Sequence, residues 1–336
     1  MINKSLIKNK IPIDVVMPWV DGSDSNHKEK LSLYLDNNDI KKIPGAHNTR
    51  FASINEIKYS ILSILKFAPF VRNIFIVTDS QNPNIEKYIK DSFPDRLNSI
   101  RIVDHKEIFE GFEQFLPTFN SRTIDRLLWR IKGLSNRYVY LNDDIFLIRN
   151  VKPDDWFCNG RPVIRGSWKF RPWLRILGNE CFKHIKKKIS KYNTINLNPS
   201  FYLSQWWSAE ILGFKFRFFR SEHTPHPVDR NRLKNYFNRY NNVFLKDLEF
   251  KFRHYNQYNT VALANHLEIS EGNIFFAPIE SIYVKPVNRQ QNYISKKIKL
   301  CAKNKSIKFI CLQSLDLAKK EDQEKIFNWM DDILSL

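Results

Sequence analysis

The chain has 336 residues, of which 43% are hydrophobic, a composition that is ordinary for a globular protein with a sizeable core in one large domain or two coupled ones. Lys and Arg total 54 against 35 Asp and Glu, which gives a formal net charge of +19. This excess indicates an anionic partner: a nucleotide, a phosphorylated polymer, an acidic membrane surface or nucleic acid. A solvated basic surface without any specific ligand explains the same charge.

The cysteines and the N-terminal residues predict the compartment. The four cysteines form no C-x-x-C pair, which argues against a disulfide framework or a zinc site and favours a reducing cytoplasm. They are Cys158, Cys181, Cys301 and Cys311. Residues 1–10 are polar and rich in lysine, unlike a secretory signal. No apolar run approaches the ~20 residues that span a bilayer, so any membrane association is expected to be peripheral.

The first 150 residues alternate between predicted strands and helices. Strands are expected at residues 13–20, 73–79, 100–104 and 138–141, and helices at residues 53–67, 85–90 and 121–134. For the helix at 53–67, Ser53 is the expected N-cap and Glu56 has the spacing of a capping box. This alternation predicts an α/β fold with a Rossmann-like, mostly parallel sheet flanked by helices.

Carboxylates follow the predicted strands. They are Asp21, Asp24, Asp79, Asp104, Asp143 and Asp144. Ligands of parallel sheets bind outside the carboxyl ends of the strands. Because so many carboxylates on one edge would repel each other unless cations or donors lay among them, this edge is the predicted functional site.

The rest of the chain is less regular in sequence. Residues 152–219 are rich in aromatic and basic residues and are interpreted as an irregular insertion or lid, with its tryptophans more often packed in a core than serving as sugar platforms. Residues 230–270 and 322–334 predict helices. We therefore expect one catalytic domain over residues 1–336, with an α/β core at 11–150, an aromatic-rich insertion at 151–220 and a helical C-terminal part at 221–336.

Several ordered blocks resemble the Stealth family. They include IDVVMPWVDGSD at residues 13–24, residues 50–79, 116–121 and 140–144 (YLNDD), and HTPHPVDR at residues 223–230. Arg253 and His254 look like the next basic site of the family, and residues 311–317 resemble the tail of its bacterial capsule members. The family transfers hexose-1-phosphate from nucleotide sugars in bacterial capsule assembly and in the tagging of animal lysosomal enzymes.

The chain also departs from this pattern. Ile57 and Lys58 stand where the family usually has Leu-Arg, and a lysine lacks the bidentate geometry of arginine, which argues against a phosphate contact at Lys58. Gln313 and Ser314 replace an Asn-Asp of many members, so no metal role is assigned there.

The proposed metal ligands are Asp143 and Asp144, which follow a buried strand beside Asn142. A phosphoryl transfer must neutralise charge on the transferred and departing phosphates. Mg²⁺ commonly does so while held by one or two carboxylates and sharing phosphate oxygens. The alternative is a turn at the end of the strand in which Asn and Asp cap the local backbone.

The donor nucleotide sugar is expected at the first block. There Asp21 and Asp24 would contact it, and Gly22 would let the backbone approach a phosphate or ribose closely. An Asp-Gly turn is also common for steric reasons alone. Further residues expected to contact the donor or the acceptor are Arg50, Asn120 and Arg130. For Asn120 and Arg130, helix capping or a surface ion pair is an equally good explanation.

Catalysis is assigned to histidine and arginine side chains. His223 and His226 are the candidate general bases, since imidazole titrates near working pH, and His223 is preferred. The planar guanidinium of arginine suits phosphate oxygens. The residues expected to clamp phosphate are Arg230, Arg253 and His254.

Together, these features predict a phosphotransferase. It would move a hexose-1-phosphate or N-acetylhexosamine-1-phosphate from a nucleotide sugar, expected to be UDP-linked, to a hydroxyl of a capsule or cell-surface glycan, and release UMP. A conventional glycosyltransferase that releases UDP is the near alternative. A nucleic-acid-binding protein is a distant one, because no helix-turn-helix, zinc finger or aromatic-basic strand pattern is found; no nucleic-acid partner is expected.

The expected location is the cytoplasm, including the inner face of its membrane, where capsule polymers are typically built. The basic stretch at residues 296–300 would contact anionic lipid there, and a solvated loop is the equal alternative.

Overall fold

The computed structural model describes residues 11–35, 51–189 and 197–336. The central sheet has five strands in the order β3-β2-β1-β4-β9. They are β3 (Ile100–Asp104), β2 (Ile74–Thr78), β1 (Ile13–Pro18), β4 (Arg137–Tyr140) and β9 (His226–Asp229). The first four are parallel, and β9 is antiparallel to β4. The predicted α/β fold with a mostly parallel sheet is therefore confirmed.

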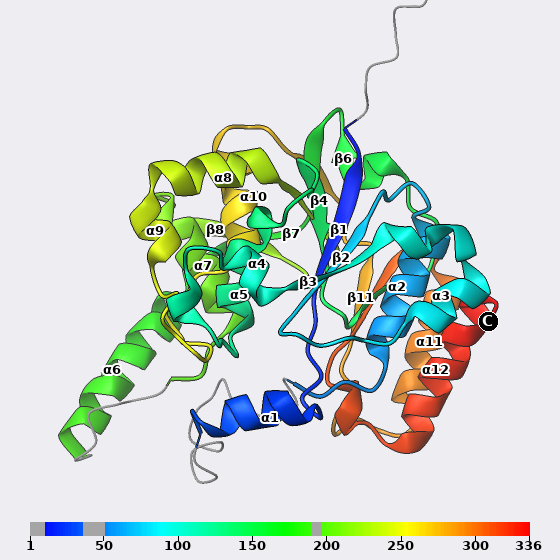
Figure 1. Ribbon diagram of the computed structural model, residues 1–336. Coiled ribbons are helices and arrows are strands. Elements are labelled where there is room, and N and C mark those ends of the chain that lie inside the picture. Colours follow the sequence, from blue (N-terminus) through cyan, green and yellow to red (C-terminus); the bar gives the residue numbers. More distant parts are fainter. Residues whose placement is uncertain (1–10, 36–50, 190–196) are drawn as a thin grey trace, which may run out of the picture.

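Helices cover both faces of this sheet (Figure 1). Because side chains of a strand alternate between its faces, Val15 and Met17 pack in one apolar core and Val16 packs in the other. The first core includes α2 (Glu56–Phe67), α3 (Glu86–Ser92), α11 (Tyr293–Lys303) and α12 (Lys320–Leu334). The second includes α4 (His105–Ile108), α5 (Ser121–Leu127), α8 (Arg230–Arg239), α9 (Asn241–Leu245) and α10 (Thr260–Ser270).

Two smaller sheets extend the core. In one, β7 (Arg161–Phe170) pairs with β10 (Phe275–Ala277), β6 (Phe157–Cys158) and β8 (Arg217–Ser221). In the other, β12 (Phe309–Leu312) lies between β11 (Ser281–Val284) and β5 (Ile145–Leu147). Since β5 follows β4 directly along the chain, this second sheet ties the C-terminal part to the central one.

Residues 152–219, whose sequence pattern is irregular, form regular secondary structure. Besides β6, β7 and β8, this part contains α6 (Trp173–Ile189) and α7 (Phe201–Ile211). Trp156 and Trp206 are fully buried, as packing residues would be.

Three helix predictions need correction. Residues 230–270 contain three helices, but residues 246–259 between α9 and α10 are not helical. The helix expected from Ser53 begins at Glu56, and its N-cap is Asn55 in the left-handed conformation (φ 71°). The Glu56 carboxylate accepts a hydrogen bond from the Ile54 backbone N–H at 2.7 Å, so no capping box forms. Residues 121–134 are α-helical only as far as Leu127.

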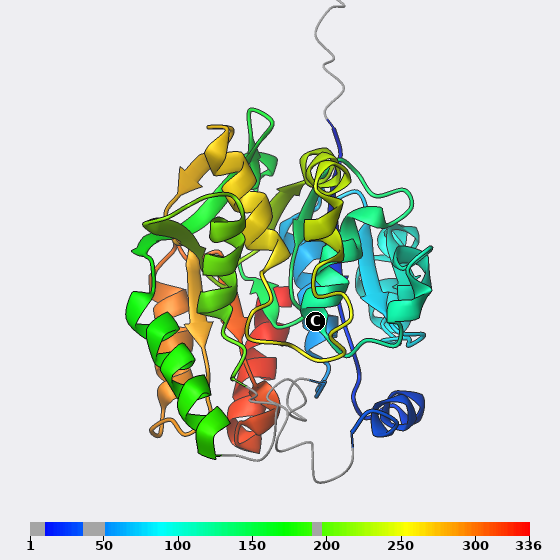
Figure 2. The same ribbon diagram turned by 90° about the vertical axis from the view of Figure 1, so that its left-hand side faces the viewer.

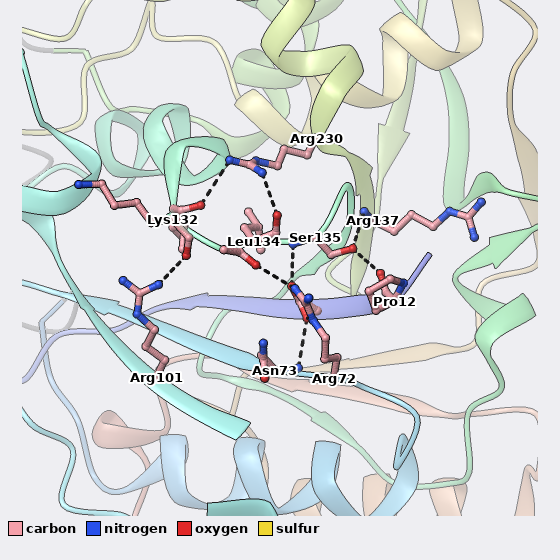
Figure 3. Close-up of polar contacts among 12 residues, drawn as sticks. Pro12, Arg72, Asn73, Arg101, Lys132, Leu134, Ser135, Arg137 and Arg230 are labelled. Carbon is pink, nitrogen blue, oxygen red and sulfur yellow. Dashed lines mark hydrogen bonds and ion pairs between the residues drawn. The ribbon is translucent and has the colours of Figure 1, made fainter. Parts of the chain in front are cut away.

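A buried carboxylate holds together the beginnings of three strands (Figure 3). Asp14 of β1 accepts hydrogen bonds from the Arg72 guanidinium at 2.8 Å, from the Asn73 N–H at 3.2 Å and from the Ser135 N–H at 2.7 Å. Arg72 and Asn73 precede β2, and Ser135 precedes β4. Charge-assisted bonds of this kind offset the cost of burying the carboxylate. They fix the edge of the sheet opposite to the carboxyl ends of its strands.

Candidate functional site

A cavity of about 810 Å³ lies at the carboxyl ends of the parallel strands. Trp19 follows β1, Asp79 follows β2, His105 follows β3 and Tyr140 ends β4, and all four line the cavity. This is the edge at which open parallel sheets bind ligands. The cavity is closed from the other side by residues of α7, β8 and the loop before α10.

The cavity brings five of the predicted site residues together. They are Asp143, Asp144, His223, His226 and Arg253. The two aspartates lie in the turn between β4 and β5, and His226 begins β9, which pairs with β4. The pairing of β4 and β9 thus explains how a histidine more than 80 positions away reaches the acidic turn.

Burial has a strong effect on three carboxyl groups of the cavity, which we call the acidic wall. They belong to Asp143, Asp144 and Glu56. It raises the pKa of Asp144 to about 6. Burial, with the neighbouring charges of Asp144 and Glu56, raises the pKa of Asp143 well above its usual range. Burial also raises the pKa of Glu56, which lines the cavity. A cation or a set of donors at this wall would favour the charged forms and relieve the repulsion.

The two aspartates fit a metal that is shared with a phosphate. Asp144 accepts a hydrogen bond from the Cys311 thiol through Oδ2 at 3.7 Å, and its buried Oδ1 has no hydrogen-bond partner. Within the described ranges, no group of three or more His, Cys, Asp and Glu side chains is arranged to hold a metal by itself. Mg²⁺ does not need such a cage, because it commonly keeps several waters and takes one or two carboxylates plus phosphate oxygens.

Positive charge faces the acidic wall. The guanidinium of Arg253 is held by Ser121, whose hydroxyl accepts from Arg253 Nε at 3.0 Å. Arg253 is close enough to lower the pKa of Asp125 and of Asp144 against the larger effect of burial. Arg122 and Lys285 also line the cavity. These cations and the two aspartates line the same cavity.

The two histidines predicted as general bases, His223 and His226, are neutral near pH 7. The His223 ring stacks on Phe201 at 4.7 Å and lies 5.0 Å from the ring of Tyr283. Burial lowers the pKa of His223 to about 4 and that of His226 to about 3. His226 is the more buried of the two, beneath the acidic turn beside Tyr140. A neutral imidazole can accept a proton, but a pKa of about 4 lies below the working pH at which imidazole was expected to titrate, so burial makes His223 a weaker base than the sequence predicted.

Sequence reasoning missed Asp125. This residue lies on α5, is only 6% exposed and lines the cavity. Burial raises its pKa to about 7, while Arg253 and a hydrogen bond with Tyr140 act in the opposite direction. The available signal was a carboxylate within an apolar helix face that includes Ile124 and Leu127. Two buried histidines of the cavity, His27 and His105, were missed as well.

The first block supports the cavity from outside. Asp21 accepts a hydrogen bond from the Ser23 N–H at 2.8 Å, and Asp24 caps α1 (Ser25–Ser32) by accepting from the His27 N–H at 2.8 Å. A Cβ on Gly22 would lie 2.5 Å from the Cβ of Phe51, so the close approach at Gly22 is to another segment of the chain. None of the three lines the cavity, whereas His27 and Phe51, which they hold, do. Arg50 lies outside the described residues.

Asn120 and Arg130 do not line the cavity either. Asn120 is fully buried and caps α5, and its amide donates to the carbonyls of Phe250 and Phe252, each at 3.0 Å. It therefore fixes the loop that carries Arg253. The Arg130 guanidinium donates to the Glu110 carbonyl at 2.6 Å and lies over the Phe112 ring.

Arg230 and His254 are also kept apart from the acidic turn. Figure 3 shows Arg230 reaching the carbonyl of Leu134 at 2.8 Å, and it donates to the Trp129 carbonyl at 2.6 Å as well. It stabilises the turn before β4. The His254 ring stacks on Phe250 at 4.5 Å. Neither residue lines the cavity, although both were expected to clamp phosphate.

Two family descriptions match the chain. Stealth protein CR1, conserved region 1, matches residues 12–39, and Stealth protein CR2, conserved region 2, matches residues 50–164. These stretches contain β1 to β6 and the turn with Asp143 and Asp144. They lie in the order in which the sequence blocks were found.

Three relatives are named capsular polysaccharide phosphotransferases. Protein cps1A of Actinobacillus pleuropneumoniae is 34% identical over 242 residues, which is 64% of each chain. Protein cps12A of the same organism is 38% identical over 182 residues, 53% of this chain and 47% of the relative. A protein of Actinobacillus suis is 33% identical over 245 residues, 66% of this chain and 64% of the relative. The chain thus spans less than two thirds of each relative's length.

Among solved structures, the galactosyltransferase LgtC in complex with donor and acceptor sugar analogs aligns over 96% of this chain and 95% of its own, with 10% identity and a TM-score of 0.41. The family assignment comes from the conserved regions and the relatives of known name. On these matches, the chain belongs to the Stealth family.

Proposed function

We propose that this protein transfers a sugar-1-phosphate from a nucleotide sugar to a hydroxyl group of a glycan. The observation that carries the proposal is the cavity in which Asp143 and Asp144 face Arg253 and His223. An acidic wall opposite basic side chains suits a reaction that moves a phosphate between two oxygens. The names of the relatives, capsular polysaccharide phosphotransferases, support the same reaction class.

The donor diphosphate would lie between the acidic turn and the cations. Asp143 and Asp144 would hold a Mg²⁺ ion, which neutralises charge on phosphate oxygens when it is bound. Arg253 and Lys285 would bind the phosphate oxygens that the ion leaves free. The part of the cavity lined by Trp19, Phe51 and Asp79 would take the nucleoside.

The transfer step then forms one bond to phosphorus and breaks one. The acceptor hydroxyl oxygen attacks the phosphorus that carries the sugar. The bond from that phosphorus to the bridging oxygen breaks, and the nucleoside monophosphate leaves with that oxygen. The hydroxyl proton passes to the neutral imidazole of His223, and the product is a phosphodiester. Asp125 would orient Arg253 through their opposite charges.

The finer identity of the substrates follows from the family relationship. We propose a UDP-linked hexose or N-acetylhexosamine as donor, a capsule or cell-surface glycan as acceptor, and UMP as the released nucleotide. The site of action would be the inner face of the cytoplasmic membrane. A glycan joined by phosphodiesters is itself polyanionic, which agrees with the net charge of +19.

A conventional glycosyltransferase would use the same donor and acidic site but leave both phosphates on the nucleotide. The distinguishing experiment incubates the protein with Mg²⁺, a panel of nucleotide sugars and capsule oligosaccharides, and identifies the released nucleotide. Monophosphate whose release depends on the acceptor supports phosphoryl transfer. Diphosphate release overturns the proposed mechanism.

Two variants connect that reaction to the cavity. Asp143→Asn and His223→Gln should each lower turnover by at least about 100-fold, because each removes a group proposed to act in the transition state. Asp154→Asn is the matched control, since Asp154 is exposed and does not line the cavity. Full activity of Asp143→Asn, with an unchanged melting curve, would argue against this site.

A further inference from the structure

An unusual group of exposed apolar side chains lies where β7 ends, α6 begins and the chain enters β8. We call it the apolar tip, and it consists of Phe170, Trp173, Leu174, Leu177 and Phe216. Leu174 is 88% exposed, Phe170 83% and Phe216 75%. Large apolar side chains exposed together, unlike single ones, mark a surface that contacts another apolar phase.

The apolar tip is held in place by the body of the protein. The Arg171 N–H donates to the Phe216 carbonyl at 2.8 Å, which joins the strand that leads into α6 to the segment before β8. Ile176 of α6 packs against the buried cluster of Trp206 and Phe218. Trp173, Leu174 and Leu177 are neighbours on this helix at three- and four-residue spacing, and each of the three is more than half exposed.

The helix that carries the tip stands away from the sheets (Figure 1), and it lies on the side of the molecule that faces the viewer in Figure 2. Of the helices within the described ranges, none is long and apolar enough to cross a bilayer.

Basic residues adjoin the residues of the apolar tip along the chain. They are Lys169, Arg175, Lys215 and Arg217. None of these four forms an ion pair with another described residue. Apolar and aromatic residues next to lysines and arginines are the combination that lies in the interface of an anionic bilayer.

We propose that the apolar tip docks this protein on the surface of an anionic lipid bilayer. Phe170, Leu174 and Phe216 would enter the boundary between headgroups and acyl chains, while Arg175 and Lys215 would contact lipid phosphates. A symmetric contact between two copies would place the same basic residues of both chains against each other, which is unfavourable. The charge of the tip therefore favours lipid over a second copy.

The docking surface is connected to the cavity along the chain. The helix α7 lies between α6 and Phe216, and β8 begins directly after Phe216; both elements contribute to the cavity wall, through Phe201, Gln205 and Ser221. Docking would hold the cavity near a bilayer and the glycan acceptors at its surface. The docking itself does not depend on the proposed reaction, because it can be measured without any substrate.

The test uses the full chain and flotation with vesicles of phosphatidylcholine and phosphatidylglycerol, compared with vesicles of phosphatidylcholine alone. The expected result is binding to the anionic vesicles that weakens as salt is raised. The double variant Leu174→Asp/Phe216→Asp should lose at least about tenfold of the vesicle affinity. Ile279→Asp, at a side chain that is 48% exposed elsewhere, should bind as the wild type does.

Two further measurements make the result decisive. The variant Lys215→Gln/Arg217→Gln retains the apolar residues and should bind anionic vesicles more weakly than the wild type. It tests the same surface if the aspartate variant misfolds. Lys296→Gln/Lys297→Gln/Lys299→Gln tests the basic stretch of α11. Unchanged binding of both tip variants, or loss of binding in the α11 variant alone, would overturn the proposal. The proposal would also be overturned if sedimentation showed that the wild type is a dimer and that the variant Leu174→Asp/Phe216→Asp is a monomer.

Discussion

Buried titratable groups are concentrated around the cavity. Burial raises the pKa of Asp125 to about 7 and that of Asp144 to about 6, while it lowers the pKa of His105 and of His223 to about 4. Perturbed groups of both kinds in one cavity are typical of functional sites. A cation bound beside these carboxyl groups would favour their charged forms.

The effect of a buried carboxyl group on the free energy of unfolding can be measured at Asp125. The folded protein holds a proton on Asp125 with a pKa of about 7, against the ordinary value of 3.8, so the stability associated with this residue falls as pH rises from about 4 to about 7. Asp125→Asn removes that loss. Relative to wild type, the free energy of unfolding of the variant should be similar near pH 4 and higher by about 2–4 kcal/mol near pH 7.

Urea unfolding at a series of pH values measures this difference. The comparison with wild type matters because buried histidines such as His105 have lowered pKa values. Their contribution to the free energy of unfolding rises with pH between about pH 4 and 6.5, opposite to that of Asp125. Their contribution cancels in the difference. Asp154→Asn is the exposed control. A difference between Asp125→Asn and wild type that does not change with pH would contradict the prediction.

At the scale of elements, small contacts hold the cavity-lining segments in place. Gly22 lets the turn after β1 come so close to Phe51 that its N–H donates to the Phe51 carbonyl at 2.6 Å. The same turn carries α1 and His27 to the cavity. Asn120 acts similarly for the loop before α10, since its amide bonds to Phe250 and Phe252.

The contact at Gly22 predicts that alanine at this position and alanine at Gly178 have different effects on the free energy of unfolding. A Cβ at position 22 would lie 2.6 Å from the Phe51 carbonyl oxygen, so Gly22→Ala should lower the free energy of unfolding by about 1–3 kcal/mol. Gly178 of α6 has nothing within 4 Å of an added Cβ, so Gly178→Ala should be neutral or stabilise by about 0.5–1 kcal/mol. Chemical denaturation measures both, and equal effects at the two sites would contradict the prediction.

At the scale of the whole molecule, the C-terminal part completes the core. The strand β12 pairs with β5, and α12 packs on α2. Phe309, Ile326 and Met330 of this part are buried in the same apolar cluster as β1 and α2. The last 30 or so residues therefore belong to the same packing unit as the first strand.

A chain that ends at Asn304 should not form this unit. It lacks β12 and α12, so a large apolar surface of α2 would be exposed to water. We expect it to lose near-ultraviolet circular dichroism and a cooperative thermal transition. A chain that lacks only Leu336, which is 48% exposed, is the control and should melt like the wild type. A cooperative transition in the chain ending at Asn304 would show that the C-terminal part is dispensable for folding.

The sequence by itself determined the family and the plan of the fold. The strands β1 to β4 are short apolar runs with a polar residue or turn after them, and such local patterns are read without knowledge of the packing. The last of these runs, β4, is followed by the turn that carries Asp143 and Asp144, so these two residues could be selected from their position alone. The ordered blocks identified the Stealth family, which the conserved-region matches confirm.

Only the tertiary structure decided which polar side chains face the cavity. Asp125 and Glu56 lie on predicted helices, and nothing local distinguishes a carboxylate that lines a cavity from one in solvent. Arg230 was selected as a phosphate ligand, yet its guanidinium bonds to the carbonyls of Trp129 and Leu134. A buried polar group bonds to whatever donors or acceptors the packing brings within reach, and those partners lie about 100 positions away along the chain. That pairing depends on the three-dimensional arrangement, which local sequence patterns do not contain.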